Sequence, residues 1–382
     1  MKKLKVSLYI LIILTLVLPE LQKQFHFFNI RKLKGAYILA SQPSIKDMKL
    51  KSWLEGDFQK KFNDAIEQHI GFRKILIRIQ NQIDYSFFNI SNADDIIIGK
   101  DGYLYEEKYI LSLKGDDFIG NNKIKNLLLK AKFLQDTLKK NNTDLILVYA
   151  PSKARFYPEY IPDSYKIKNN ETTNFDNFIK ISDELKLNYI DFNTYFTKIK
   201  DTSRYPLYSK CGTHWSNYGM LLCTDSLINY IEEVHKTKLP HIHWNGVRIS
   251  NDIKSGEYDI EQTMNLLWEM PHDNMAYPKF KVEENSENKK LNLLSVADSY
   301  YWGIFMSGLP KKLFRKNNFW YYNKKEYPLV KGQKKPKEVQ DLNLYQSIIN
   351  TDVIVLLATE CNLSNFSFGF IDNAYNLFKG NN

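Results

Sequence analysis

Two short segments carry residue types that could perform acyl-transfer chemistry. Residues 291–300 predict a buried strand that ends in a turn, with Ser299 at the carboxyl end of the strand, where open α/β sheets bind ligands. Residues 212–215 place His214 between a threonine and a tryptophan. A serine hydroxyl is a weak nucleophile until a neighbouring base, usually histidine, removes its proton. We therefore hypothesise that Ser299 and His214 meet in the fold.

Both residues also have a purely structural interpretation. A serine that follows an aspartate at a strand end commonly satisfies the backbone of a turn, and a histidine beside a tryptophan commonly packs in a core. The residues after His214 add a further expectation: Ser216 and Asn217 can cap a following helix. A helix N-terminus disfavours the charged form of His214, and a neutral imidazole is what a general base requires.

The elements around these segments alternate between helices and apolar strands. Strands are predicted at 144–150, 188–192, 291–296 and 352–358, helices at 122–140, 174–185, 339–349 and 368–378, and helices also between 51 and 90. A hairpin is predicted at 97–105, and residues 245–290 read as polar and irregular, apart from a short helix at 261–268. The alternation predicts an α/β fold in which helices flank a parallel sheet.

The N-terminus combines a lysine cluster with an apolar run from residue 6 to residue 18. This is the pattern of a secretion signal, but no small-residue cleavage site follows the run. We expect an uncleaved anchor at 1–21, a juxtamembrane connector at 22–50 and one catalytic domain at 51–382. The positive-inside rule places that domain outside the cytoplasmic membrane, in the periplasm.

The charge of the chain indicates which classes of binding partner to expect. The chain has 382 residues, of which 43% are hydrophobic, and a formal net charge of +10, with much of the positive charge in residues 311–337. A basic surface favours acidic partners, and because no nucleic-acid motif accompanies it, we expect a membrane or glycan partner and no nucleic acid. A solvated lysine-rich loop is the alternative.

No metal or cofactor is expected. The three cysteines lack the spacing of a metal site, and the histidine pair 241 and 243 lacks a nearby third ligand.

Several short motifs follow one another along the chain: Gly71-Phe72-Arg73, the segment 99–105, Pro151-Ser152-Lys153 with Tyr157-Pro158-Glu159, Thr213-His214-Trp215 with Gly219, and Asp298-Ser299. In this order they resemble the membrane-anchored, SGNH-hydrolase-like polysaccharide O-acetyltransferases of the alginate AlgJ/AlgX type. The resemblance implies a three-layer SGNH-hydrolase-like domain that moves acetyl groups onto a polysaccharide hydroxyl. It assigns Ser299 as the acetylated nucleophile and His214 as the base. It also implies a membrane-bound O-acyltransferase that delivers acetyl groups across the membrane.

One position departs from the family pattern. The family's acid usually stands two residues before the histidine, and that position here is Gly212. Neutralising the equivalent aspartate of a serine protease costs about 10⁴ in turnover. Either another carboxylate substitutes, or the enzyme works as a slower dyad, or activity is lost. The candidate substitutes are Glu360, Asp252 and Asp259, with Glu360 favoured because it ends a predicted strand.

Other groups are candidates for the oxyanion or the substrate. The backbone amide of Ser299 is the preferred oxyanion donor, since a turn leading into a helix leaves it free. Asn362, Trp215 and Lys153 are further candidates, and packing is the alternative role for Trp215.

Three functions remain open from the sequence. The leading one is O-acetyl transfer to an exported polysaccharide. An acetyl esterase would use the same residues with water as the acceptor, and a catalytically impaired scaffold or glycan-binding member of a secretion complex would explain Gly212.

Overall fold

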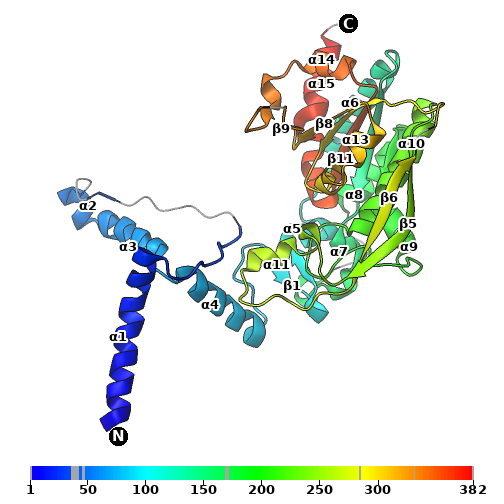
Figure 1. The fold of residues 1–382 in the computed structure, drawn as a ribbon. Coiled ribbons are helices and arrows are strands. Elements are labelled where there is room, and N and C mark those ends of the chain that lie inside the picture. The colour runs from blue at the N-terminus through cyan, green and yellow to red at the C-terminus, as the bar shows by residue number, and fades with distance from the viewer. Residues whose placement is uncertain are drawn as a thin grey trace. The chain divides into compact units, whose positions relative to one another are not determined.

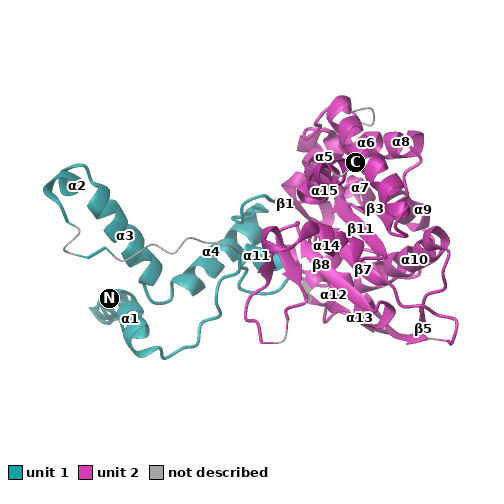
Figure 2. Cartoon of the chain, turned by 90° about the horizontal axis from the view of Figure 1, so that it is seen from above, with its two compact units in different colours: residues 1–96, 261–270 teal, residues 97–260, 271–382 magenta. Residues whose placement is uncertain are grey.

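The computed structural model describes residues 2–35, 43–44, 48–167, 172–283, 285–330 and 332–380. The chain divides into two compact units, coloured separately in Figure 2. Unit 1 comprises residues 1–96 and 261–270, and unit 2 comprises residues 97–260 and 271–382. The predicted division into anchor, connector and catalytic domain remains a prediction, and residues 36–42 and 45–47 of the predicted connector lie outside the described residues.

Unit 1 is helical. Helix α1 (Lys2–Phe25) is long and apolar enough to cross a membrane, a property that a signal sequence shares. The helices that follow are α2 (Leu50–Leu54), α3 (Asp57–His69) and α4 (Arg73–Phe88). Gly71, in the turn between α3 and α4, packs against α1 so closely that a Cβ atom there would lie 1.8 Å from the carbonyl oxygen of Pro19. The Gly71 motif therefore joins these helices to α1.

Unit 2 is built on a seven-stranded sheet with the order β10-β9-β8-β7-β11-β3-β4. Strands β8, β9 and β11 of this sheet are labelled in Figure 1. The strands are β3 (Asp144–Ala150), β4 (Tyr189–Asp191), β7 (Asn292–Ala297), β8 (Lys316–Tyr321), β9 (Lys325–Tyr327), β10 (Lys337–Glu338) and β11 (Val353–Thr359). Neighbours from β8 to β4 pair in parallel, whereas β9 and β10 add an antiparallel edge. The predicted α/β class is confirmed.

Both faces of the sheet are buried, as is typical of parallel sheets. Alternate residues of β3 point to opposite faces, so that Ile146 and Val148 join one apolar core while Leu147 and Tyr149 join the other. The first core includes side chains of α9, α10, α12 and α13, and the second includes side chains of α6, α8 and α15. The helices of unit 2 are α5 (Glu107–Lys114), α6 (Asn121–Lys139), α7 (Lys153–Phe156), α8 (Asn174–Glu184), α9 (Phe192–Ile199), α10 (Asn217–His235), α12 (Tyr301–Met306), α13 (Leu309–Leu313), α14 (Leu344–Ile349) and α15 (Phe370–Lys379).

Two predicted segments differ from the structure. Residues 245–290, predicted to be irregular, contain most of an antiparallel hairpin formed by β5 (His241–Ser250) and β6 (Met275–Glu283). Helix α11 (Asp259–Met264) lies between these two strands in the chain. The alternation of the hairpin is broken by a bulge between Trp244 and Val247, and this break hid its period from the sequence. The basic stretch contributes β8, β9 and β10 to the edge of the sheet and is more than a solvated loop. The hairpin predicted at 97–105 is confirmed by β1 (Ile96–Ile98) and β2 (Leu104–Glu106).

Candidate active site

Ser299 lies two residues beyond the last residue of β7, at the carboxyl end of the central parallel strands. The side chain of Asp298, which is fully buried, holds this turn together. One carboxylate oxygen accepts the backbone N–H of Tyr300 (3.0 Å), and the other accepts the N–H (2.7 Å) and hydroxyl (2.8 Å) of Thr359 at the end of β11. Asp298 thus ties the turn that carries Ser299 to the neighbouring strand β11, a role that residue type alone does not indicate.

His214 and Ser299 are in hydrogen-bonding contact, with 3.0 Å between Nε2 and the serine Oγ. The histidine lies just before α10, whose N-cap is Ser216 as the sequence predicts. Tyr300 supports the histidine from one side: its ring centroid is 4.8 Å from that of His214, and its hydroxyl donates to the carbonyl of Thr213 (2.6 Å). The two halves of the site are therefore fixed to each other by packing as well as by the hydrogen bond between His214 and Ser299.

Asp259, the first residue of α11, completes a chain of three groups. Its Oδ2 lies 2.5 Å from Nδ1 of His214, and its Oδ1 accepts the backbone N–H of Thr213 (2.8 Å). With the Nδ1 proton donated to the carboxylate, Nε2 is left free to accept the proton of the Ser299 hydroxyl. The arrangement has the order of groups of a Ser-His-Asp triad.

The carboxylate also sets the charge preference of the histidine. Burial of the ring lowers the pKa of His214, but the attraction and hydrogen bond of Asp259 outweigh burial and raise this pKa above its ordinary value, with smaller contributions from Glu106 and Asp298. The expectation from the helix N-terminus alone was that the charged form would be disfavoured. That expectation was wrong because it did not include Asp259.

Gly212 explains why the acid arrives from a different segment. A Cβ atom on Gly212 would lie 2.6 Å from the carbonyl carbon of Glu257, 2.7 Å from its oxygen and 2.8 Å from the carbonyl oxygen of Gly256. The backbone that leads into Asp259 therefore crosses directly over Gly212 and uses the space that a side chain would need. The glycine and the displaced acid are two parts of one arrangement.

The other two candidate acids lie elsewhere in unit 2. Glu360, favoured from the sequence, is buried and forms an ion pair with Arg155, whose Nε lies 3.1 and 3.0 Å from the two carboxylate oxygens. Asp252 is exposed in the turn after β5, where its backbone N–H donates to Ser250. The preference for Glu360 was wrong because the strand end that carries it also faces Arg155, which binds its carboxylate.

Two further candidates are engaged in structural contacts, and a third group is free within the described part of the chain. Asn362 donates its amide to Asp298 (2.8 Å) and to Thr359 (3.1 Å), so it supports the nucleophile turn. Trp215 is 4% exposed and packs edge-on against Tyr300, which favours the packing role. Among the described residues, the Ser299 backbone N–H has no hydrogen-bond acceptor, as an oxyanion donor requires.

Lys153 is buried, and its ammonium lies against the loop that leads to His214. Its ammonium donates to the carbonyl oxygens of Leu104 (2.8 Å), Lys210 (2.7 Å) and Gly212 (2.8 Å). Burial lowers the pKa of Lys153 to about 7, although the nearby Cys211 and Asp259 act in the opposite direction. The three donors of the ammonium match the three carbonyls, so this lysine holds the loop that leads to His214.

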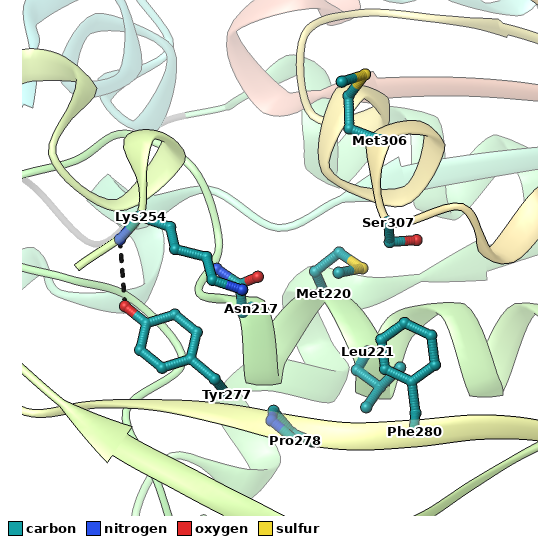
Figure 3. A pocket seen from close by; sticks show the side chains of 9 residues that line it. All are labelled: Asn217, Met220, Leu221, Lys254, Tyr277, Pro278, Phe280, Met306 and Ser307. Atoms are coloured by element: carbon teal, nitrogen blue, oxygen red, sulfur yellow. Dashed lines mark hydrogen bonds between the residues drawn. The ribbon is translucent and has the colours of Figure 1, made fainter. Parts of the chain in front are cut away.

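A groove of about 310 Å³ lies beside α10 and the hairpin (Figure 3). Its polar residues include Asn217, Lys254 and Tyr277, and the Lys254 backbone N–H donates to the Tyr277 hydroxyl (3.2 Å), the contact dashed in Figure 3. The remaining lining is mostly apolar, contributed by Met220, Leu221, Pro278, Phe280 and Met306, together with Ser307. The groove borders the first turn of α10, just after His214.

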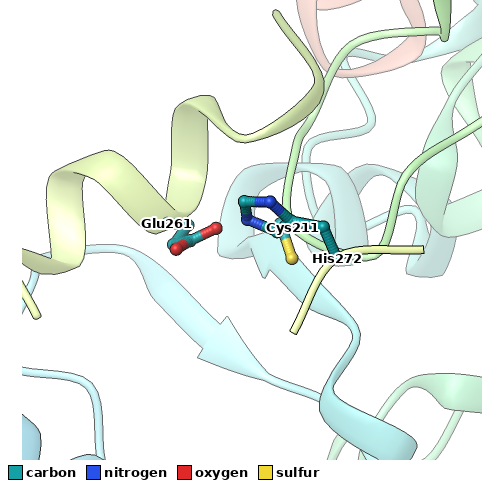
Figure 4. A group of neighbouring side chains, drawn as sticks. All are labelled: Cys211, Glu261 and His272. Carbon is teal, nitrogen blue, oxygen red and sulfur yellow. The ribbon is translucent and has the colours of Figure 1, made fainter. Parts of the chain in front are cut away.

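Cys211 and His272 bring two possible metal ligands together within unit 2. The sulfur of Cys211 and a ring nitrogen of His272 lie within 4.8 Å of each other, and both side chains are drawn in Figure 4. Two ligands from one unit are fewer than the three or four that a zinc site uses, and we assign no metal to them.

Comparison with known proteins gives the same family as the motifs. A family model described as the SGNH hydrolase-like domain of the acetyltransferase AlgX matches residues 96–285, a range that includes His214 and Asp259 and ends before Ser299. Two proteins named probable alginate O-acetylase AlgJ are similar in sequence. The one from Pseudomonas syringae pv. tomato is 26% identical over 36% of this chain and 34% of its own length, and the one from Pseudomonas aeruginosa is 22% identical over 49% and 46%.

The matched regions span less than half the length of these relatives. Among solved structures, the O-acetyltransferase domain of Pseudomonas putida AlgJ is 13% identical, with a TM-score of 0.45 over 74% of this chain and 99% of that one. Pseudomonas aeruginosa AlgX is also 13% identical, with a TM-score of 0.47 over 73% of this chain and 67% of that one. The sequence matches show that the chain is similar to the AlgJ/AlgX-type alginate O-acetyltransferases, with an SGNH hydrolase-like domain matched over residues 96–285.

Proposed function

We propose that the protein transfers acetyl groups onto hydroxyls of an exported polysaccharide through an acetyl-Ser299 intermediate. The observation that carries the proposal is the continuous line of hydrogen bonds from Ser299 Oγ to His214 Nε2 (3.0 Å) and from His214 Nδ1 to Asp259 (2.5 Å). A scaffold that had lost activity has no need of this alignment. The names of the relatives make alginate-like uronate chains the first acceptors to test.

The reaction takes two displacement steps. Ser299 Oγ attacks the carbonyl carbon of an acetyl donor while His214 Nε2 takes its proton, and the Ser299 N–H stabilises the oxyanion. The bond to the leaving group breaks, and the imidazolium returns the proton to that group. An acceptor hydroxyl then attacks the acetyl-serine and gives its proton to His214, and Ser299 leaves and takes the proton back. Asp259 stabilises the imidazolium in both steps.

Helix α1 suits the same function. A polysaccharide is modified during export, and an uncleaved α1 would keep the catalytic unit beside the membrane, facing the periplasm, within reach of a membrane-bound O-acyltransferase that supplies acetyl groups. Recovery of a shortened mature chain from the soluble periplasm would contradict this anchoring role.

The test uses the full-length protein in detergent with 4-nitrophenyl acetate as donor and either oligouronate or neutral oligosaccharides as acceptors. Mass spectrometry of the oligosaccharides and an assay for free acetate are run in parallel. We expect acetylated oligosaccharide from wild type and none from Ser299→Ala. Free acetate alone would favour the esterase, and no turnover by a folded protein would favour the scaffold.

A further inference from the structure

The segment that delivers Asp259 is fastened by a second carboxylate, Glu257, which is completely buried. One of its oxygens accepts the backbone N–H (2.9 Å) and the side-chain amide (3.1 Å) of Asn217, the first residue of α10. The other accepts the Tyr277 hydroxyl of β6 (2.5 Å) and the Lys254 N–H (3.1 Å). Four donors from three elements thus converge on one carboxylate.

This contact pattern satisfies both oxygens of the Glu257 carboxylate. A buried carboxylate is stable when hydrogen bonds satisfy its oxygens, and the N-terminus of a helix adds a favourable field. Asn217 begins the same helix that His214 precedes, so Glu257 fixes the acid-bearing segment to the element that also places the base. The backbone of Glu257 meanwhile packs on Gly212, two residues before that base.

We propose that Glu257 is a positioning residue for catalysis: it holds the 256–259 segment over Gly212 so that Asp259 stays behind His214. This inference rests on the proposed function, since it concerns the third group of the same site. In the family pattern named above, a two-residue spacing on one loop joins acid and base covalently. Here the acid lies 45 residues further along the chain, and noncovalent contacts must replace that short link.

The groove of Figure 3 is lined on its polar side by the three residues that contact Glu257, namely Asn217, Lys254 and Tyr277.

The test is a double-mutant cycle on the full-length protein, with Glu257→Gln and Asp259→Asn made singly and together. Turnover of 4-nitrophenyl acetate and the pKa of His214, followed by histidine NMR, are both measured. We expect Glu257→Gln to lower kcat by about 10²-fold with little change in KM, because a misplacement near 1 Å costs that much. We also expect it to lower the pKa of His214, since the carboxylate that raises this pKa is displaced. In the Asp259→Asn background, Glu257→Gln should change turnover by less than about threefold. This variant has already lost the Asp259 carboxylate, so a shift of the 256–259 segment no longer displaces an acid from His214.

Two further variants make the outcome decisive. Asp144→Asn removes another buried carboxylate, which lies at the first residue of β3, at the opposite end of the strand from the candidate site. This carboxylate accepts hydrogen bonds from Lys139 and His235. The Asp144→Asn variant controls for general loss of stability and should leave the pKa of His214 unchanged. Tyr277→Phe removes the hydroxyl that donates to Glu257 and accepts from the Lys254 N–H, but it keeps the Glu257 side chain. This variant serves if Glu257→Gln fails to fold, and it should give a smaller loss of the same kind.

Equal losses from Glu257→Gln with and without Asp259 would overturn the inference, as would an unchanged His214 pKa in folded Glu257→Gln or Tyr277→Phe. If Asp259→Asn alone leaves both turnover and the His214 pKa as in wild type, the role of Asp259 is overturned, and with it the positioning role of Glu257. The proposed function fails separately, when Ser299→Ala turns over 4-nitrophenyl acetate as fast as wild type.

Discussion

Placing the family's usual acid at position 212 of this protein should lower both its stability and its turnover. The substitution Gly212→Asp puts a carboxylate two residues before His214, where the AlgJ/AlgX pattern has it. In this chain the first atom of that side chain meets backbone: the Cβ would lie 2.6 Å from the Glu257 carbonyl carbon, against the 3.4 Å at which ordinary contacts begin. The 256–257 backbone must therefore retreat by about 0.8 Å or the histidine loop must move.

Either movement separates the Asp259 carboxylate from the His214 ring. Overpacking of this kind costs about 1–3 kcal/mol of the free energy of unfolding. A shift near 1 Å at the segment that carries Asp259 costs about 10²-fold in turnover. Because the clash begins at Cβ, Gly212→Ala should lose nearly as much as Gly212→Asp. The added carboxylate should recover little of the loss.

The assay compares Gly212→Asp and Gly212→Ala with Gly246→Ala, all in the full-length protein. Gly246 has no atom within 4 Å of an added Cβ and is the matched control. Thermal unfolding and turnover of 4-nitrophenyl acetate are measured for each variant. We expect both Gly212 variants to be less stable and less active, and Gly246→Ala to behave as wild type. Turnover by Gly212→Asp at or above the wild-type value would refute the reasoning, because it would mean that the position accepts an acid and that Asp259 is dispensable.

Three further predictions follow from the same geometry. Asp259→Asn should lower kcat by about 10³–10⁴-fold, by analogy with serine proteases. Because the carboxylate raises the pKa of His214 and the base must be neutral, the acidic limb of the pH–rate profile should also move to lower pH. Glu360→Gln should leave that limb in place and mainly reduce stability, since its carboxylate binds Arg155. Lys153→Met should lower the thermal unfolding midpoint by roughly 10 °C or more, because three carbonyls lose their donor at about 1–3 kcal/mol each. An unfolding midpoint equal to that of wild type would contradict the role given to Lys153.

Local patterns account for the parts of the fold that the sequence predicts well. The strand at 144–150 coincides with β3, because a continuous apolar run bounded by polar residues has few other stable placements. The capping role of Ser216 and the position of Ser299 beyond its strand also follow from short-range chemistry. The edge strands and the hairpin were harder to predict, since β9 has three residues and β5 carries a bulge.

The identity of the acid depends on contacts that no local pattern reports. Glu360 and Asp259 are both carboxylates near element ends, and their difference lies in what faces them: Arg155 in one case and His214 in the other. The signal that was available is Gly212 itself. A glycine where a side chain is expected indicates close backbone approach, and the approaching segment is the one that carries Asp259.

The central claim is that Ser299 is the acetylated nucleophile and that His214 activates it. The measurement that tests this claim most directly is intact mass spectrometry of the full-length protein after brief exposure to 4-nitrophenyl acetate, with Ser299→Ala and His214→Ala beside wild type. The account predicts that wild type gains the mass of one acetyl group, mapped to Ser299, that Ser299→Ala gains none, and that His214→Ala gains it far more slowly. An acetyl group that maps to another residue, or that forms on Ser299 at the same rate without His214, would contradict the account.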